Sequence, residues 1–575
     1  MPCLRNQSRG NNRGASDGQK TSRRQRAASM GPPPVVSKAG RVYNAPESEQ
    51  NRKLRLNTMG MDQAQTLVSD RIGKSDSGSR SSIWTSNTAV LIYMALGTVI
   101  LHTIVGNRYG FHRDELATLD DARHLAWGYP AYPPVTPFFG RISLILFGTS
   151  LSGFRLFASL AHGATVVLAG LIARDLGGKR RAQFLAGAAA LPACIGGGAL
   201  MQYVSFDYFA WVLTAYFVIR LLKTGNPRWW AAIGASIGFG MLSKYAICFF
   251  VVGIAVGLLF TDARQYLKSK WLWIGVSVAL LMFLPNLLWQ VQHQFVSLDL
   301  LRFIHARDVR RGDTSSFLPD QLTHTLLPLV VAGLYFYLFS RQAARFRMVG
   351  WMYVTTLVVF AIAKGKSYYI YPAYPMIYAA GAVWVEGWLA TMRRRAAVAI
   401  WSITWTLVAC GAIFTTAFCL PIAPVNSHWF ETSLAAGQPE FRAEFGWQEM
   451  VQEVARIRDS VTPQERAHLG ILADNTGEAG AVNLYGAQYG LPRAISGINS
   501  NWQHGYGNPP PQTLIVVGQT WEAADRNFEA CRLAGHLWDR YGVKTDEMGW
   551  GPDIFVCGPP RLGWPEFWKR FKYYG

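Results

Sequence analysis

The chain has 575 residues, of which half are hydrophobic and only 16% are charged, and it contains 21 tryptophans. Repeated apolar runs of about 20 residues, the length needed to cross a bilayer core, exclude an ordinary soluble protein. The net charge of +21 lies mostly in an N-terminal tail and in short loops between apolar runs, so it indicates membrane topology and no nucleic-acid partner. The seven cysteines form no CxxC or zinc-ligand spacing, and we predict no metal framework.

Residues 1–83 are rich in Arg, Ser, Gly and Gln and nearly free of aromatic residues. Such a segment cannot bury enough apolar surface to fold, so we predict a disordered basic tail. No apolar run stands near Met1, which argues against a cleavable signal peptide. A basic tail before the first apolar run favours a cytoplasmic N-terminus.

The apolar runs predict an α-helical polytopic membrane protein in a domain over residues 84–419, surrounded by membrane lipids. Five inter-span loops on the expected inner side are basic, which supports both the predicted number of spans and the orientation of the chain in the membrane. The loop 106–137, the loop 290–323 and the C-terminal 155 residues then face outward. A broken hairpin at 229–260 and an additional span near 136–150 are left open. The eleven expected spans are 89–105, 153–173, 182–200, 204–222, 229–243, 246–260, 271–289, 324–340, 348–363, 368–389 and 396–417.

From about residue 420 the composition becomes compatible with water. The segments HLGILAD, EAGAVNLYGAQYG, TLIVVG, WEAADRNFEACRLAGHLWDRYG and DIFVCG predict strand, helix, strand, helix and strand, in that order. We therefore expect a small periplasmic α/β domain over 420–575. No GxGxxG follows a strand, so a dinucleotide site is not indicated. Cys531 and Cys557 both lie here, and the sequence leaves open whether they pair or remain thiols.

The loop after the first span, GNRYGFHRDELATLDDARHLAWGYPAYPPVTP, holds more charged and aromatic residues than a connector needs. Asp114 and Glu115 are its first acids, and a carboxylate at a membrane surface can act as a general base on a hydroxyl. A solvated acid pair or a helix cap is the plainer interpretation. Asp207 stands near the outward end of a later span, where a carboxylate is costly and indicates function. A divalent cation near Asp114 and Asp207 is left open, since no spacing argues for it.

Several basic residues fall on the outward side, against the trend of the other loops. An anionic lipid phosphate would explain lysines there, because lysine binds phosphate as a point charge. Neighbouring tyrosines supply hydroxyl donors or belong to an aromatic belt. The segment 295–317 has the spacing of an amphipathic helix lying on a membrane, and its arginines are phosphate contacts or a solvated face. The predicted binding residues are Lys244, Arg302, Lys364, Lys366, Tyr368 and Tyr369.

The segments YGFHRDEL, AWGYPAYPPVTPFFGRIS, SFDYFAW, LSKYA and KGKSYYIYPAYPMIYAAGA together resemble the membrane glycosyltransferases of the GT-C class. The resemblance covers residues 84–420 and is greatest to the bacterial branch related to dolichyl-phosphate-mannose protein mannosyltransferases and lipid A aminoarabinose transferases. The segment ADNTGEAGAVNLYGAQYGLPRAISGINSNWQHGYG also resembles the periplasmic tail of the bacterial members.

The resemblance implies a bacterial inner-membrane enzyme that moves a sugar from a polyprenyl-phosphate carrier to an envelope glycan, lipid or protein. It implies that Asp114 is the catalytic acid, Glu115 a sugar or acceptor contact and Asp207 a cavity acid. Lys364 and Lys366 then face the carrier phosphate. A single displacement with Asp114 as base predicts inversion at the sugar carbon. Two rival hypotheses are a flippase of lipid-linked sugar, which would not need the acidic loop, and a scaffold, which leaves Asp114 unexplained.

Overall fold

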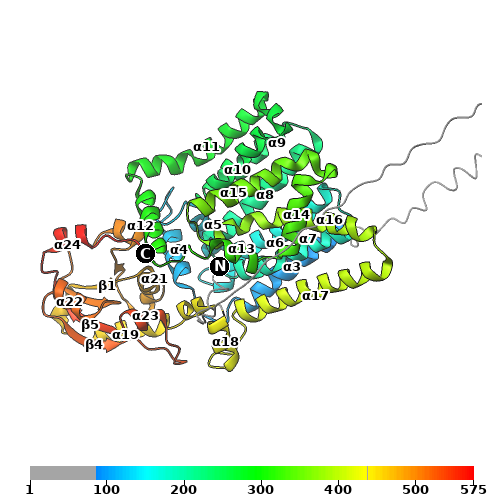
Figure 1. The fold of residues 1–575 in the computed structure, drawn as a ribbon. Helices are drawn as coiled ribbons and strands as arrows, with labels where there is room; N and C mark the ends of the chain where they lie inside the picture. Colours follow the sequence, from blue (N-terminus) through cyan, green and yellow to red (C-terminus); the bar gives the residue numbers. More distant parts are fainter. Residues whose placement is uncertain (1–85, 437) are drawn as a thin grey trace, which may run out of the picture. The chain divides into compact units, whose positions relative to one another are not determined.

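The computed structural model describes residues 86–436 and 438–575, so the predicted basic tail lies outside the described residues. From residue 87 to residue 419 the chain is helical, and it then forms a smaller part that contains a sheet (Figure 1). The helices of the first part are α3 (Asn87–Val105), α4 (Arg113–Arg123), α5 (Val135–Phe147), α6 (Leu151–Asp175), α7 (Arg180–Gly197), α8 (Tyr203–Thr224), α9 (Trp229–Met241), α10 (Ile247–Leu259), η2 (Asp262–Lys268), α11 (Lys270–Gln292), α12 (Val296–Arg310), α13 (Phe317–Thr323), α14 (Leu327–Phe339), η3 (Arg341–Phe346), α15 (Arg347–Ile362), η4 (Ser367–Ala373), α16 (Tyr374–Ala390) and α17 (Arg394–Cys419).

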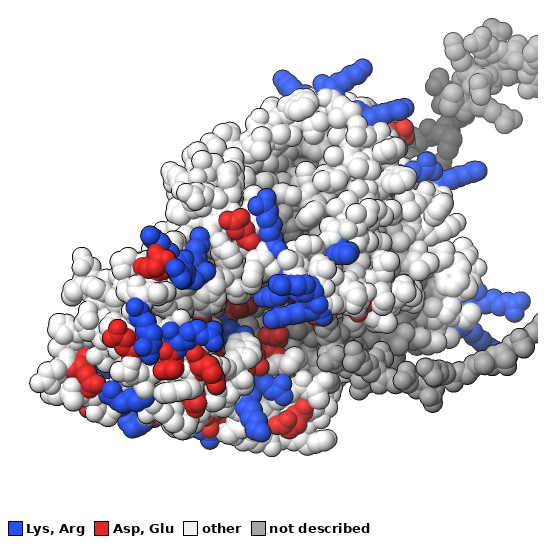
Figure 2. All heavy atoms as spheres, turned by 60° about the vertical axis from the view of Figure 1, so that its left-hand side comes forward, with Lys and Arg blue, Asp and Glu red and all other residues white. Residues whose placement is uncertain are grey.

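Among the described residues, six helices are long and apolar enough to cross a membrane, or up to eight if each of two bent pairs is one span. Each of the eleven expected ranges contains helix, but the count of eleven is not confirmed, because α7 is not among these six helices and α9, α10, α14 and α16 are short. The span left open near 136–150 corresponds to α5, an apolar helix of 13 residues that is not among the six. Figure 2 shows charges of both signs over the C-terminal part, basic side chains at the opposite end of the helices, and a mostly uncharged surface between them.

Small residues let the helices approach closely, as is usual where packing drives association within lipid. Gly234 on α9 and Gly275 on α11 face each other so closely that a Cβ on either would collide with backbone atoms of the other helix. Gly333 on α14 and Gly381 on α16 make the same kind of contact between their helices. These approaches explain why α9 with α11 and α14 with α16 form closely packed pairs in the bundle.

The C-terminal part holds one five-stranded sheet in the order β2-β1-β3-β5-β4, which confirms the expected α/β domain. Strands β2, β1 and β3 are parallel, with Leu472 opposite Ile495 and Val516, whereas β5 runs antiparallel to β3 and β4. The elements are α18 (His428–Ala436), η5 (Pro439–Glu444), α19 (Trp447–Ser460), α20 (Pro463–Ala467), β1 (Leu469–Ala473), α21 (Thr476–Tyr485), η6 (Gly486–Tyr489), β2 (Ala494–Ile495), η7 (Asn499–His504), β3 (Thr513–Val517), α22 (Trp521–Asn527), β4 (Arg532–His536), α23 (Asp546–Trp550), β5 (Asp553–Cys557) and α24 (Trp564–Arg570).

One prediction for this domain is wrong. The segment 521–542 was expected to be a single helix, but it is helical only in α22 and then forms β4. Strand β4 pairs with β5, and a disulfide joins Cys531 to Cys557 beside that pairing. Long-range pairing with β5 therefore overrides the helical propensity of the segment, and the open question about the two cysteines is answered by a bond.

A single hydrophobic core joins α4 to the C-terminal domain. It contains Leu116 and Leu119 of α4, the adjoining ends of α5, α6 and α8, and buried residues of α19, α21 and the sheet. Gly480 of α21 lies directly against the backbone of Leu116. The acidic first loop is therefore enclosed between the helices and the C-terminal domain, which is what places its side chains at a common site.

We expect Gly480→Ala to lower the melting temperature, because the new Cβ would lie 2.8 Å from the carbonyl carbon of Leu116 and α21 would have to move off α4. Overpacking of this kind typically costs about 1–3 kcal/mol. Gly549→Ala is the matched control, since Gly549 is also helical and nothing lies within 4 Å of the added Cβ. Thermal unfolding of the purified protein checks this, and equal melting temperatures for the two variants would contradict the close contact.

Candidate active site

The N-terminus of α4 sends two neighbouring acids in different directions. His112 is the N-cap: its Nδ1 accepts a hydrogen bond from the backbone N–H of Asp114 at 3.1 Å. Glu115 completes a capping box, because its Oε2 accepts from the backbone N–H of His112 at 3.0 Å. As a result the Asp114 side chain is 58% exposed, whereas Glu115 is fully buried.

Glu115 is held by Arg155, a buried arginine of α6. The Arg155 Nη2 donates to Glu115 Oε2 at 2.6 Å and to Glu444 Oε2 at 3.3 Å, and Met201 donates its backbone N–H to Glu115 Oε1 at 2.8 Å. These partners saturate the carboxylate. Burial opposes ionisation, but the charge and hydrogen bonds of Arg155 hold the pKa of Glu115 below its usual value. The arrangement favours a positioning role for Glu115, because its carboxylate has no open side from which to contact a sugar or acceptor.

Asp114 faces the start of α8. Its Oδ2 accepts a hydrogen bond from Gln202 Nε2 at 3.0 Å, and Gln202 immediately precedes α8. Gln202 is the one side-chain donor to this carboxylate among the described residues, which leaves acceptor positions on Asp114 for another group. A half-exposed carboxylate fixed at one oxygen fits the requirement for a base that must reach a substrate hydroxyl.

Lys244 stands beside the same end of α8 within an aromatic enclosure. Its Nζ lies 5.3 Å from the ring centroid of Tyr203, 5.5 Å from that of Tyr368 and 4.5 Å from that of Tyr369. In the part of the chain that the structure describes, no carboxylate oxygen lies within 4.0 Å of this amine. Three electron-rich faces stabilise the ammonium group without neutralising it, so its charge remains available to an anionic group.

Asp207 lies one turn inside α8 and is buried. Its Oδ1 accepts a hydrogen bond from Trp211 Nε1 at 2.9 Å, an i,i+4 contact within the helix. The carboxylate interacts electrostatically with Lys244 across the enclosure. Asp207 therefore belongs to the same group of side chains but supports it from within the helix bundle.

The remaining predicted residues are placed less centrally. Lys366 pairs with Asp308 of α12 at 2.8 Å, so its charge is already compensated. Lys364 is exposed in the turn after α15, with a φ of 48°. Arg302 is 78% exposed on α12, where it contacts Asp299 at 3.6 Å. The structure brings Asp114, Asp207, Lys244, Tyr368 and Tyr369 around the start of α8 and leaves Arg302 and Lys364 at the surface.

Sequence reasoning missed the residues that bind the first loop to the C-terminal domain. Arg113 donates to Asp546 and Glu547, both at 2.9 Å, and Arg493 donates to Asp120 at 2.9 Å. These partners are hundreds of residues apart in the chain, so no local pattern could pair them. Arg155 did carry a signal, because an arginine inside an expected span requires a partner in the protein interior.

Comparison with known proteins shows similarity in sequence and in fold. Residues 131–289 match the family described as dolichyl-phosphate-mannose-protein mannosyltransferase. The chain is 28% identical over 190 residues to lipid A galacturonosyltransferase RgtD of Rhizobium johnstonii, an alignment that spans 30% of this chain and 38% of that relative. In fold it resembles the crystal structures of ArnT from Cupriavidus metallidurans. The structure with undecaprenyl phosphate has a TM-score of 0.53 and 15% identity, covering 83% of this chain and 99% of that one; the apo structure has a TM-score of 0.51 and 15% identity, covering 82% and 98%.

These findings show that the chain is similar to the GT-C membrane glycosyltransferases, as the sequence motifs predicted. Within that class, the chain is similar to the dolichyl-phosphate-mannose protein mannosyltransferases in sequence and to ArnT in fold. The predicted α-helical polytopic membrane protein with a small C-terminal α/β domain is confirmed.

The N-cap of α4 should make stability depend on pH. Burial of His112 opposes its charging, and protonation of Nδ1 gives up the bond that the neutral ring accepts from Asp114, but an ion pair with Glu440 at 3.6 Å and the charges of Asp114 and Glu444 raise its pKa to about 9. The unfolded value is about 6.5. A raised histidine pKa stabilises the fold fully below the unfolded value, and this contribution is lost as the pH rises towards 9.

We therefore expect the melting temperature of the native protein to fall between pH 6.5 and 9 more steeply than that of His112→Asn. Asparagine is a favourable N-cap, so the variant keeps the helix start while removing the titrating group. Thermal unfolding of both proteins across this range gives the difference directly. Parallel curves would show that His112 does not carry the raised pKa.

Proposed function

We propose that this chain is a glycosyltransferase that moves a sugar from a polyprenyl-phosphate carrier to an acceptor hydroxyl at the outer face of the bacterial inner membrane. The observation that carries the proposal is the placement of two groups at the start of α8: the half-exposed Asp114 carboxylate, which accepts from Gln202, and the Lys244 amine, which lies over the ring of Tyr203. A reaction with a nucleophilic hydroxyl and an anionic leaving group needs one group of each kind. The likeness to a galacturonosyltransferase and to an ArnT structure bound to undecaprenyl phosphate supports this class of donor.

In the proposed reaction, Asp114 takes the proton of the acceptor hydroxyl while that oxygen attacks the anomeric carbon. The bond between the anomeric carbon and the phosphate oxygen breaks, and the carrier phosphate leaves with the electron pair. One displacement inverts the sugar carbon. Lys244 stabilises the charge that develops on the phosphate, and fixed charges at a developing anion are among the largest contributions to catalysis.

The other side chains hold this pair in place. Glu115 and Arg155 fix the first turn of α4, so that Asp114 points towards Gln202. Tyr368 and Tyr369 position the Lys244 amine and offer hydroxyl donors beside it. Lys366 is paired with Asp308 but lies in the same segment as the tyrosines. When the carrier phosphate enters, Lys366 leaves Asp308 and pairs with the phosphate. In this proposal the reaction takes place on the outer side of the membrane, so the N-terminus is cytoplasmic and the C-terminal domain is periplasmic.

We expect Asp114→Asn to lower the turnover of a polyprenyl-phosphate sugar by about 10²–10⁴-fold, the usual contribution of a general base. Release of polyprenyl phosphate from purified protein, supplied with a panel of lipid-linked sugars and acceptors, is the measurement. Asp525→Asn is the matched control, because Asp525 has similar exposure, 56%, on the C-terminal domain. Native-like turnover by the Asp114→Asn variant would remove the base from the mechanism.

We expect Lys244→Ala to reduce kcat/KM for the donor by about 10- to 100-fold, the typical effect of losing one charge-assisted contact. Lys569→Ala, an exposed lysine on α24, is the control and should leave turnover unchanged. The same assay at varied donor concentration separates binding from catalysis. If the Lys244→Ala variant retained the native kcat/KM, Lys244 would not be the phosphate contact, and Lys364 or Lys366 would be the next candidates.

A further inference from the structure

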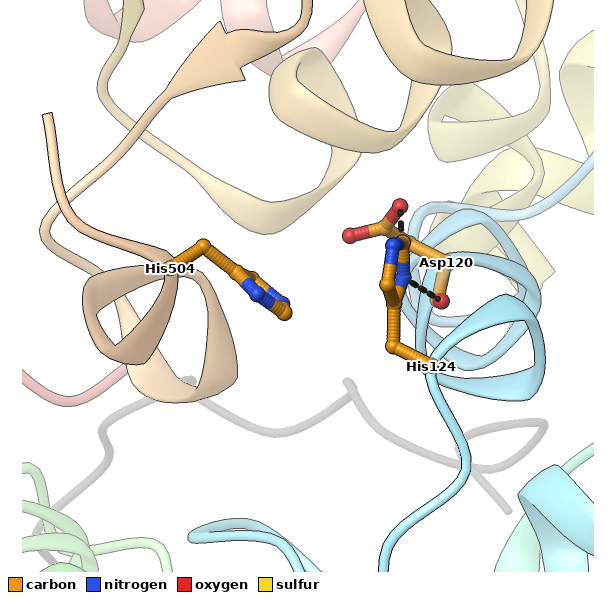
Figure 3. Close-up of side chains that lie close together, drawn as sticks. All are labelled: Asp120, His124 and His504. Carbon is orange, nitrogen blue, oxygen red and sulfur yellow. Dashed lines mark hydrogen bonds and ion pairs between the residues drawn. The ribbon is translucent and has the colours of Figure 1, made fainter. Parts of the chain in front are cut away.

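Away from Lys244, the C-terminal end of α4 meets the C-terminal domain at three potential metal ligands. Asp120 and His124 lie one turn apart on α4, and His504 ends η7. One ligand atom from each residue lies within 4.8 Å of those from the other two. Figure 3 shows His504 directed across a gap towards the pair on α4. Two segments about 380 residues apart in the sequence thus supply one cluster.

The hydrogen bonds of His124 determine which of its nitrogens is free. Its Nδ1 lies 2.9 Å from the carbonyl oxygen of Asp120, and a carbonyl only accepts, so Nδ1 carries the proton. Nε2 of the neutral ring therefore has a lone pair directed away from α4. Metal-binding histidines are commonly oriented in this way, with the second ring nitrogen donating to a carbonyl or carboxylate.

A cation already occupies this position. The Arg493 guanidinium donates through Nη1 to His124 Nε2 and through Nη2 to Asp120 Oδ2, each at 2.9 Å. Arginine has no acceptor, so both partner atoms present lone pairs to positive charge. Arg123, the other nearby arginine, is directed to the carbonyl of Asn483 at 2.7 Å. Arg493 is therefore the group with which a metal ion would compete.

We propose that Asp120, His124 and His504 form a binding site for Zn²⁺, which displaces Arg493 and joins α4 to the C-terminal domain. Two imidazole nitrogens and one carboxylate oxygen are a ligand set that suits zinc, with a fourth position for water. Magnesium and calcium prefer oxygen ligands only, so they bind weakly here. His124 and His504 are exposed, which gives the ion access from solvent, and Asp120 is buried. The site does not depend on the proposed transferase reaction.

The test is zinc binding by the full chain, purified in detergent without a histidine tag and stripped with a chelator. Calorimetric titration should show one zinc ion per chain in native protein. We expect His124→Ala and His504→Ala to weaken binding at least tenfold, and Arg493→Gln to tighten it, because the competing cation is removed. His536→Ala is the matched control: His536 pairs with Asp553 at 2.7 Å but belongs to no three-ligand cluster among the described residues, so its loss should leave affinity unchanged.

Thermal unfolding provides a second readout that also verifies folding. Zinc should raise the melting temperature of native protein and of Arg493→Gln, but not that of His504→Ala or of the more conservative His504→Asn. Without metal, the two His504 variants should melt at the same temperature as the native protein. Absence of zinc binding in native protein, or native affinity in the His504 variants, would overturn the site. Unchanged affinity in Arg493→Gln would overturn the competition. Neither readout uses turnover, so these outcomes are independent of the proposed activity.

Discussion

The site depends on the buried guanidinium of Arg155. It donates to Glu115 and Glu444 and to the carbonyl oxygens of Gly106 and Gly110, at 3.0 and 3.1 Å respectively. An arginine buried without partners would be strongly unfavourable, so each of these segments must close around it. One side chain of α6 thereby fixes the first loop, the start of α4 and the entry to the C-terminal domain.

This constraint explains why two adjacent acids have different fates. The capping box turns Glu115 inward to Arg155, and the helical geometry then directs Asp114 to a different side of α4, towards Gln202. The base that we propose must be both fixed and accessible, and the pair divides these requirements between buried Glu115 and exposed Asp114. The C-terminal domain completes the arrangement, because its core is continuous with Leu116 and Leu119 of α4.

The sequence predicted the parts that depend on local pattern. Apolar runs located helices at all eleven expected places, and the alternation of segments after residue 420 predicted the α/β domain. Prediction failed where distant contacts decide the structure. Strand β4 forms because β5 is available to pair with it, and Glu115 is buried because Arg155 lies opposite. For the candidate site, residue type indicated Asp114, Lys244 and Arg302 alike. Only the fold shows that Asp114 and Lys244 lie at the start of α8 whereas Arg302 is exposed on α12.

Two of the three lysines predicted to bind phosphate, Lys366 and Lys244, show that the surroundings of a lysine, and not its residue type alone, determine how readily it can bind an anionic ligand. Lys366 has a carboxylate partner at 2.8 Å, and an incoming phosphate would have to displace Asp308. Lys244 is surrounded by tyrosine rings, which attract the ammonium group but cannot cancel its charge. A leaving phosphate would therefore gain more from Lys244, since no existing ion pair has to be broken. Preorganised charge of this kind requires little rearrangement during the reaction, so in the proposed mechanism the carrier phosphate is stabilised by Lys244 at the start of α8.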